Sequence, residues 1–236
     1  AALYAKTGEV HINIAARSNT KSNAKALVEK EVKSLKERIG DCVYCTDGSE
    51  LHETVVKLLT ETGIKISLAE SCTGGLLASK ITEVDGASKV FEYGMAAYAD
   101  WVKQKSLDVD PAVIRRYTAV SSVTAAEMAK GAFENGQSDI GVGITGLAGP
   151  SAGDYVDKPV GLVYIAVADE EHVIVKKFNF TASRGRSYIR EMCAKNALDM
   201  VRRFVLGLPI EGARQFEEKQ LADLDREKPR SKSSIA

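Results

Sequence analysis

The chain has few of the cysteines that stabilise a small secreted protein through disulfides, and it lacks the long apolar runs of a membrane protein. Its 236 residues include four cysteines, three histidines and one tryptophan, and aromatic residues make up 6%. A disulfide-dense scaffold needs far more cysteine. No apolar run approaches the ~20 residues of a transmembrane helix, and no signal peptide opens the chain. We therefore expect a cytoplasmic protein with no membrane partner.

An excess of charge of one sign is also missing. Thirty-two lysines and arginines balance thirty-two aspartates and glutamates, which gives a formal net charge of zero. This balance removes the chain-wide attraction to nucleic acid or to an anionic membrane, although a local basic pocket remains compatible with it. With 44% hydrophobic and 27% charged residues, the composition is that of a globular protein. The length suits one large domain, or an ordinary domain with a small companion.

The cysteines do not form the pattern of a structural metal site. Cys42 and Cys45 make a single Cys-x-x-Cys pair, and the second pair that a structural zinc site needs is absent from the sequence. The two cysteines flank Val43 and Tyr44 in a segment that is typical of a buried strand. We therefore expect both to be small apolar thiols of the core.

Residues 1–48 predict a small α+β module of a strand, a helix and a strand. Apolar and polar residues alternate from Glu9 to Ala15, and apolar residues recur at helical spacing from Ala24 to Leu35, before Gly40. Cys42 to Cys45 would supply the second strand. Such a module is too small for a stable core of its own, so we expect it to lean on another part. The chain does not begin with methionine, which suggests an interior cut.

Residues 49–208 predict a layered α/β domain with a mixed sheet. A helix capped by Ser49 should stop at Gly63. Strands are expected at 65–69, 94–99, 139–144, 161–168 and 172–180, interleaved with helices near 74–83, 121–134 and 186–206. The last two strands should form a hairpin. Residues 209–236 are expected to be an extension in which a helix frays into a partly disordered tail.

A glycine-rich turn follows the first expected strand of this domain. It contains Ser71, Cys72, Thr73, Gly74 and Gly75. A serine at a helix N-terminus would lie beside unpaired backbone N–H groups that can stabilise an oxyanion or a phosphate, and glycine lets a ligand approach the backbone. The alternative is that Ser71 or Thr73 merely caps the helix.

A second glycine-rich turn, Gly143 to Pro150, also follows an expected strand directly. Parallel strands that end at one edge of the sheet would bring both turns into one crevice, the usual ligand site of open α/β sheets. Neither turn matches the dinucleotide-binding or the Walker pattern, which disfavours folds of those types. Two ordinary tight turns are the alternative.

A nucleophilic serine needs a proton acceptor, and the histidines are poor candidates. His11 and His52 belong to the first module and the helix after it, and His172 should be exposed near the hairpin turn. A desolvated lysine with a lowered pKa can do the same work. The sequence contains several lysines that are candidates for this role.

Lys103 follows Tyr98 at an expected junction between a strand and a helix, and Tyr98 could relay or orient the proton. A tyrosine near a strand end is also common in ordinary packing. Lys80 and Lys105 are rivals of Lys103, and spacing alone leaves the choice open.

Arginines open the last long helix. Arg186 and Arg190 are four residues apart on one helical face, where they could hold a phosphate by forked hydrogen bonds. Solvated surface arginines are the alternative.

Taken together, these segments resemble the CinA C-terminal domain family, the nicotinamide-nucleotide amidases called PncC. The matching motifs are Ala69 to Gly75, Tyr98 with Lys103, Ala119 to Ser121, Ile144 to Pro150 and Lys158 to Gly161. The resemblance covers about Glu50 to Leu208. The first 48 residues resemble the KH-type segment of longer CinA proteins, which begin with a molybdopterin-binding-like domain associated with ADP-ribose pyrophosphatase activity. We expect this chain to lack that activity.

The resemblance implies a site with named roles. Ser71 would be the nucleophile and Lys103 the base, accompanied by Tyr98. The substrate-binding residues that it implies are Cys72, Thr73, Gly74, Gly75, Thr145, Gly146, Ala148, Gly149, Arg186 and Arg190. The implied partner is nicotinamide mononucleotide or a similar nucleotide, and a homo-oligomer is expected.

The sequence departs from the family pattern near the base and near the phosphate end. The family commonly has Ser or Thr and then Asn after the tyrosine, whereas this chain has Ala99 and Asp100. A carboxylate near Lys103 would favour the charged lysine, which is the wrong direction for a base. The 151–153 and 184–186 segments also differ from the family, so the phosphate contacts could be rearranged.

The implied reaction is an acyl transfer in two steps. Neutral Lys103 accepts the proton of Ser71, whose oxygen attacks the carboxamide carbon, while backbone N–H groups from Cys72 to Gly74 hold the oxyanion. Ammonia leaves, and water then releases nicotinate mononucleotide. This chemistry requires no metal and no organic cofactor.

Three alternatives stay open. The chain could be a catalytically silent nucleotide-binding or regulatory module of the CinA type, or an amidohydrolase that acts on another small amide. An RNA-binding protein is disfavoured, because the first module has neither a Gly-x-x-Gly clamp nor a basic stripe.

Overall fold

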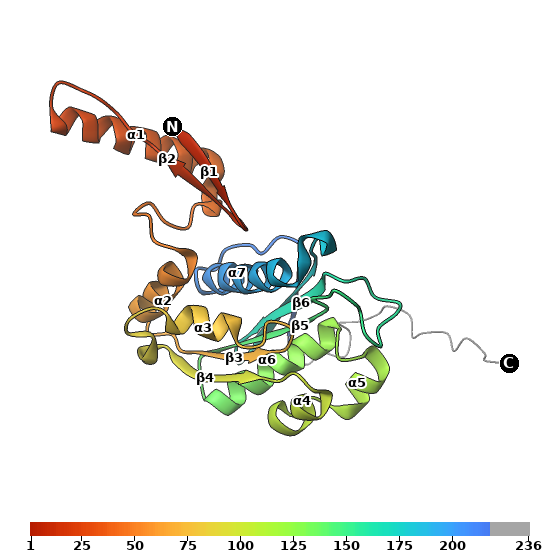
Figure 1. The fold of residues 1–236 in the computed structure, drawn as a ribbon. Coiled ribbons are helices and arrows are strands. Elements are labelled where there is room, and N and C mark those ends of the chain that lie inside the picture. Colours follow the sequence, from red (N-terminus) through yellow and green to blue (C-terminus); the bar gives the residue numbers. More distant parts are fainter. Residues whose placement is uncertain (218–236) are drawn as a thin grey trace.

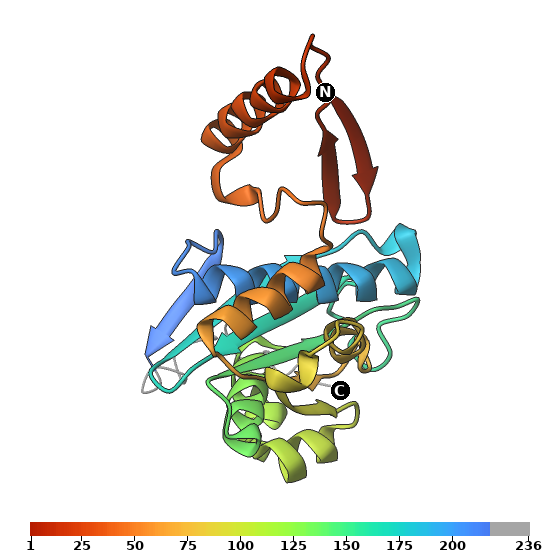
Figure 2. The same cartoon turned by 90° about the vertical axis from the view of Figure 1, so that its left-hand side faces the viewer.

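The computed structural model of the chain describes residues 1–217 (Figure 1). The chain begins with an antiparallel hairpin of β1 (Ala2–Lys6) and β2 (Glu9–Asn13), followed by α1 (Lys21–Ile39). Figures 1 and 2 show the hairpin and α1 standing off the remaining elements. No residue of α1 is buried. The first module therefore has little core of its own, as its small size predicts.

The expected strand at Cys42–Cys45 is wrong. Gly40 ends α1 with a φ of +63° and begins a short 3₁₀ turn, Gly40–Cys42. Arg202 Nη2 donates to the main-chain oxygen of Asp41 at 2.8 Å, so this segment is held on another helix and does not pair with a strand. Cys42 is exposed and Cys45 half-buried, which corrects the expectation of core thiols. The strand that pairs with β2 is β1, which precedes it.

The large sheet has the order β4-β3-β5-β6-β7-β8. Its parallel part contains β4 (Phe91–Ala96), β3 (Ile66–Glu70) and β5 (Ile140–Gly146). Its antiparallel part contains β6 (Leu162–Ala168), β7 (His172–Asn179) and β8 (Ala213–Glu217). The expected mixed sheet and the expected hairpin of β6 and β7 are confirmed.

The strand β8 corrects the interpretation of the C-terminal extension. Residues 213–217 were expected in a fraying helix, but they pair antiparallel with β7 from Ala213 opposite Lys176 to Glu217 opposite His172. Without β8, β7 would present an unpaired edge. The rest of the expected tail, residues 218–236, lies outside the described residues.

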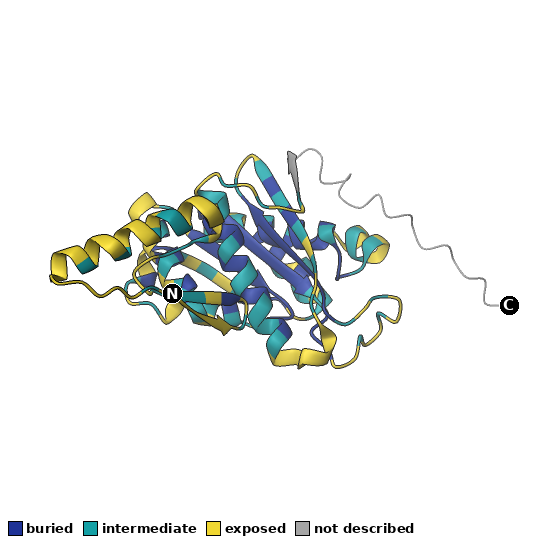
Figure 3. Ribbon diagram, turned by 90° about the horizontal axis from the view of Figure 1, so that it is seen from above, coloured by how far each residue is buried: buried dark blue, intermediate teal, exposed yellow. Residues whose placement is uncertain are grey.

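Helices cover both faces of the large sheet. One layer contains α2 (Leu51–Thr62), α3 (Leu76–Thr82) and α7 (Gly185–Val205), and the opposite layer contains α4 (Asp100–Leu107), α5 (Pro111–Tyr117) and α6 (Ser122–Gly136) (Figure 1). Short 3₁₀ turns lie at Ala87–Lys89 and Ala182–Arg184. Buried residues concentrate in the central strands, whereas α1 is largely exposed (Figure 3). None of the helices among residues 1–217 combines the length and the apolar character that crossing a bilayer requires.

Helix α6 packs very closely on β5. A Cβ atom added at Gly143 would lie 2.2 Å from the carbonyl oxygen of Ala125, and one added at Gly141 would lie 2.1 Å from that of Ala129. Glycine is therefore needed at both positions, since the helix backbone occupies the space that a side chain would take. This contact fixes β5, and with it the loop that follows β5.

Candidate active site

The two glycine-rich loops meet at one edge of the sheet. β3 and β5 are parallel neighbours, with Glu70 opposite Ile144, and the loops leave their carboxyl ends. The backbone N–H of Ser71 donates to the carbonyl oxygen of Ile144 at 2.9 Å. The expectation that both turns lie together is confirmed, and a direct hydrogen bond joins the first turn to the strand that carries the second.

Ser71 lies in a tight turn between β3 and α3. Ser71 is 8% exposed, and its carbonyl oxygen accepts a hydrogen bond from the Gly74 N–H at 3.1 Å. Gly74 and Gly75 have φ values of +58° and +91°, which residues with a side chain rarely adopt. The two glycines therefore allow the chain to reverse into the helix immediately after the serine.

Glu70 binds the start of helix α3. Its carboxylate accepts hydrogen bonds from the N–H groups of Gly75 at 3.1 Å, Leu77 at 3.1 Å and Ala78 at 2.8 Å, and the residue is 1% exposed. These helix N–H groups are thus not available to a substrate. Sequence reasoning gave Glu70 no role. A signal existed, because a glutamate that ends an apolar strand before a glycine-rich turn must find buried donors.

Two backbone donors of the loop remain available. Among residues 1–217, the N–H groups of Cys72 and Thr73 have no acceptor, whereas Gly74 and Gly75 donate to Ser71 and Glu70. The hydroxyl oxygen of Thr73 is buried, and it too has no partner in this part of the chain. Donors of this kind next to a serine can stabilise an oxyanion.

Lys103 is the buried lysine near this loop. The residue is 1% exposed, and its Nζ donates to the carbonyl oxygen of Tyr98 at 3.0 Å. Burial lowers the pKa of Lys103 below its usual value, while the nearby Asp100 carboxylate acts in the opposite direction. Cys72 also raises this pKa electrostatically. Because β3 and β4 are parallel neighbours with Glu70 opposite Ala96, the segment that leads to Lys103 leaves the same edge of the sheet as the Ser71 loop.

The rival lysines have different surroundings. Lys80 forms an ion pair with Glu191 at 2.9 Å, and Lys105 is exposed. Neither is buried as Lys103 is. The structure thus distinguishes Lys103 by burial, which spacing alone could not do.

Tyr98 contacts the site through two different groups. Its main-chain oxygen accepts from Lys103, whereas its hydroxyl accepts from Arg186 Nη2 at 3.2 Å. The residue is 62% exposed. The hydroxyl therefore lies beside a guanidinium, and the contact between Tyr98 and Lys103 is made by the main chain.

The two arginines of α7 bind the two loops. Arg186 Nη1 donates to the carbonyl oxygen of Gly149 at 2.7 Å. Arg190 donates to the carbonyl oxygen of Thr73 through Nε at 3.1 Å and Nη2 at 2.6 Å. Both expected phosphate contacts are therefore hydrogen-bonded to main-chain oxygens in this structure. Arg186 is exposed and Arg190 is half-buried.

The other predicted site residues of the second loop make contacts that support the fold. The Thr145 hydroxyl donates to the carbonyl oxygen of Ala119 at 2.6 Å, and Ala148 is buried. A Cβ atom at Gly146 would lie 2.6 Å from the Val163 side chain. Thr145 thus supports the turn before α6. Within residues 1–217, Thr145 makes no hydrogen bond to Lys103.

Lys158 supports the same turn from the other side. Its Nζ donates to the Thr118 hydroxyl at 2.9 Å and to the carbonyl oxygen of Val120. The sequence placed Lys158 in a motif without giving it a role. A lysine that follows a loop and precedes a proline gives no sign of which distant carbonyl it binds.

The two buried cysteines lie together behind the serine loop. Cys72 and Cys193 pack in one apolar cluster, and their thiols are hydrogen-bonded. This hydrogen bond, together with burial, raises the pKa of Cys193 well above its usual value. The Cys193 thiol is therefore held in the neutral form that suits a packed core.

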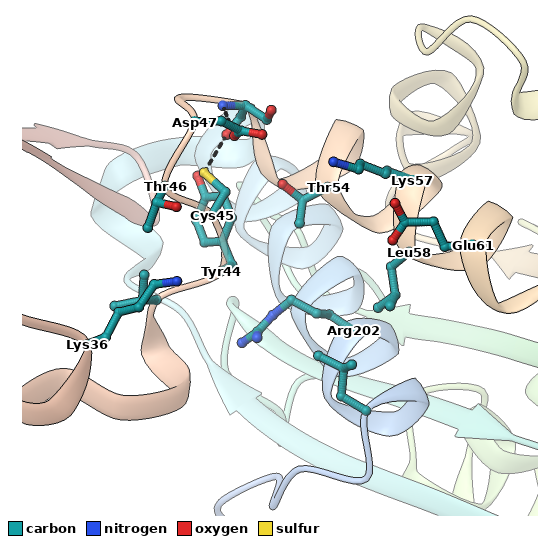
Figure 4. Close-up of a pocket in the computed structure, with 13 residues that line it drawn as sticks. Lys36, Tyr44, Cys45, Thr46, Asp47, Thr54, Lys57, Leu58, Glu61 and Arg202 are labelled. Atoms are coloured by element: carbon teal, nitrogen blue, oxygen red, sulfur yellow. Dashed lines mark hydrogen bonds between the residues drawn. The ribbon is translucent and has the colours of Figure 1, made fainter. Parts of the chain in front are cut away.

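A pocket of about 360 Å³ lies beside the start of α2 (Figure 4). It is lined by Tyr44, Cys45 and neighbouring residues of the segment before α2, by α2, and by Arg202 and Leu206 near the end of α7. The catalytic candidates are not among its lining residues. It marks the junction between the first module and the α/β part.

Glu9, His11 and Glu50 form a cluster whose side chains could together hold a metal ion. Each carboxylate already has a cationic partner: Lys195 Nζ lies 2.5 Å from Glu9, and Lys6 Nζ lies 2.7 Å from Glu50. The negative charge that would attract a metal is therefore neutralised by lysines, and we assign no metal to this cluster.

Comparisons with known proteins agree over almost the whole described chain. The family model of the CinA C-terminal domain matches residues 48–205, and that of the damage-inducible protein CinA KH domain matches residues 1–45. A CinA-like protein of Kosmotoga olearia is 44% identical over 205 residues, which are 87% of this chain and 49% of that protein. The chain thus spans about half the length of the curated relatives it matches.

Solved structures show the same fold. The competence/damage inducible protein CihA from Agrobacterium tumefaciens is 34% identical, with a TM-score of 0.62, and the match covers 68% of this chain and 96% of that one. A competence-damaged protein (CinA) superfamily protein from Escherichia coli is 27% identical, with a TM-score of 0.62, covering 70% and 98%. The layered α/β fold is therefore shared with these proteins.

Proposed function

Because the chain belongs to the CinA family, we propose that it hydrolyses the carboxamide of nicotinamide mononucleotide to nicotinate mononucleotide and ammonia. The observation that carries the proposal is a buried lysine beside a serine loop that has spare backbone donors. Burial lowers the pKa of Lys103, and a neutral amine is the form that can accept a proton from Ser71.

The first step forms an ester. Lys103 accepts the Ser71 proton as the serine oxygen bonds to the carboxamide carbon, and the carbonyl oxygen becomes an oxyanion. The free N–H groups of Cys72 and Thr73 are the proposed donors to that oxyanion, and loss of one such donor typically costs ~3 kcal/mol. Lys103 then returns the proton to the departing ammonia.

The second step repeats this chemistry with water. Lys103 accepts a proton from water, whose oxygen attacks the ester carbon, and the serine oxygen leaves with that proton. Nicotinate mononucleotide is released and the free enzyme is restored. Every proton transfer uses the amine of Lys103.

The test is ammonia release from three substrates: nicotinamide mononucleotide, free nicotinamide and the nicotinamide dinucleotide. We expect turnover of the mononucleotide and much slower reaction of the other two. Equal rates on all three substrates would contradict the proposed specificity for the mononucleotide. No release from any of them would contradict the amidase function.

A silent nucleotide-binding module is the second candidate, and one contact favours it. The Asp100 carboxylate lies 3.5 Å from Lys103 Nζ and acts to keep the lysine charged. In that case the mononucleotide would bind without being hydrolysed. Titration calorimetry beside the ammonia assay separates the two candidates, because binding without turnover supports the silent module.

A further inference from the structure

Arg190 helps to hold a peptide group in the glycine-containing turn after Ser71. The Thr73–Gly74 peptide is followed by two glycines with positive φ, and glycine imposes the weakest restriction on the backbone. The carbonyl of this peptide points to Arg190, and its N–H donates to the Ser71 oxygen. The same carbonyl also accepts a hydrogen bond from the Leu76 N–H at 3.3 Å. If the peptide rotated, all of these contacts would be lost and the turn that carries Ser71 would change shape.

The arginine grips this carbonyl with the edge of its guanidinium. Nε and Nη2 both donate to one oxygen, and this pair of nitrogens is one of the edges with which arginine binds an anion by two parallel hydrogen bonds. The position that a Cβ atom would occupy at Gly74 lies 3.7 Å from Nη2, so the guanidinium packs against the glycine as well. One phosphate-binding edge is thus occupied by the main chain.

Glu70 and Arg190 hold the same turn at two different places. Glu70 accepts from the N–H groups that follow it, and Arg190 donates to the Thr73 carbonyl inside it. The N–H groups of Cys72 and Thr73, which have no acceptor in the described chain, lie along the chain between Glu70 and the Thr73 carbonyl. The orientation of these two donors therefore depends on both anchors.

We infer that Arg190 is a positioning residue that orients the Ser71 loop through the Thr73 carbonyl, and that it does not bind the substrate phosphate. This inference rests on the proposed amidase function. It separates the two arginines of α7, since Arg186 contacts the second loop through Gly149.

The experiment compares Arg190→Lys with the unmodified chain on two substrates, nicotinamide mononucleotide and its phosphate-free riboside. Lysine keeps the positive charge, but it cannot donate two hydrogen bonds from one planar group as a guanidinium does. We expect kcat to fall by on the order of 10² on both substrates, because a small misplacement of reacting groups costs that much, with little change in KM. Arg115→Lys, at an exposed position of α5, is the matched control and should behave as the unmodified chain.

Hydrogen exchange supplies a readout that does not depend on activity. We expect the amides of Gly74 and Leu76 to exchange faster in Arg190→Lys, while the strand β5 keeps its protection, because the turn loses its anchor and the fold does not. The same change in Arg190→Gln, at a lower charge, would support a geometric role.

Two results would overturn the inference. One is a higher KM for the mononucleotide alone with kcat retained, which identifies a phosphate ligand. The other is unchanged exchange at Gly74 and Leu76. If the unmodified chain hydrolyses neither substrate, the amidase proposal fails, and the exchange measurement still decides whether Arg190 anchors the loop.

Discussion

The amine of Lys103 lies 3.5 Å from the carboxylate of Asp100, and the two side chains are 2% and 46% exposed. Burial favours the neutral amine, and the carboxylate favours the ammonium. The lysine is thus subject to two opposing effects, and burial is the larger one. Because Asp100 is half exposed, solvent screens its influence.

Replacing Asp100 by asparagine should lower the pKa of Lys103 further. A base works only when neutral, so the rise of kcat/KM with pH should move to lower pH in Asp100→Asn, and the rate at neutral pH should increase. A pH profile of ammonia release checks this. Asp108→Asn, at the exposed end of α4, is the control and should leave the profile in place. A shift to higher pH would contradict the role of Lys103 as the base.

Replacing Ser71 by alanine should abolish ammonia release without changing the circular-dichroism spectrum. The substitution removes the attacking oxygen, while the backbone N–H of residue 71 can still donate to Ile144. Ser79→Ala, on the exposed side of α3, should retain full activity. Undiminished turnover in Ser71→Ala would remove the nucleophile assignment.

Replacing Glu70 by alanine should destabilise the fold strongly. Three backbone N–H groups would lose their acceptor, and each buried unsatisfied donor costs about 1–3 kcal/mol, so a loss of roughly 3 kcal/mol or more is expected in urea unfolding. Glu70→Gln keeps one acceptor oxygen and should lose less. Glu61→Ala, on the exposed face of α2, should change stability little. Equal stabilities of all three variants would show that Glu70 does not anchor α3.

Replacing Gly143 by alanine should push α6 away from β5. The added Cβ would meet backbone atoms of Ala125 and Ala129, which cannot move independently of the helix, and overpacking of this kind costs about 1–3 kcal/mol. Gly94→Ala is the control, since its Cβ would meet the far end of the Phe91 side chain. Thermal unfolding of both variants tests the difference, and equal melting temperatures would argue against close packing at Gly143.

The sequence pattern predicts the central strands and their loops well. Apolar strands such as Ile66–Glu70 and Ile140–Gly146 are buried on both faces, and burial of this kind leaves a strong signal in the sequence. Strands at the edge of the sheet leave a weaker signal in the sequence. Ala213–Glu217 is a short and largely polar segment that pairs with β7, so its sequence does not indicate a strand.

The contacts of charged residues are much harder to predict. The motifs place Arg186 and Arg190 near the site, but an arginine can bind a phosphate, a carboxylate or a carbonyl with similar geometry. The choice depends on which oxygen the tertiary fold brings within reach. In the same way, the spacing of Lys80, Lys103 and Lys105 cannot say which of them is buried.

The hydrogen bond from Ser71 to Ile144 joins two stretches of chain that are far apart in sequence, so neither can drift without the other. A loop that is already tethered has little disorder to lose when a small molecule arrives. The cost of arranging this crevice falls on folding, which leaves more of the ligand's binding energy for the reaction itself.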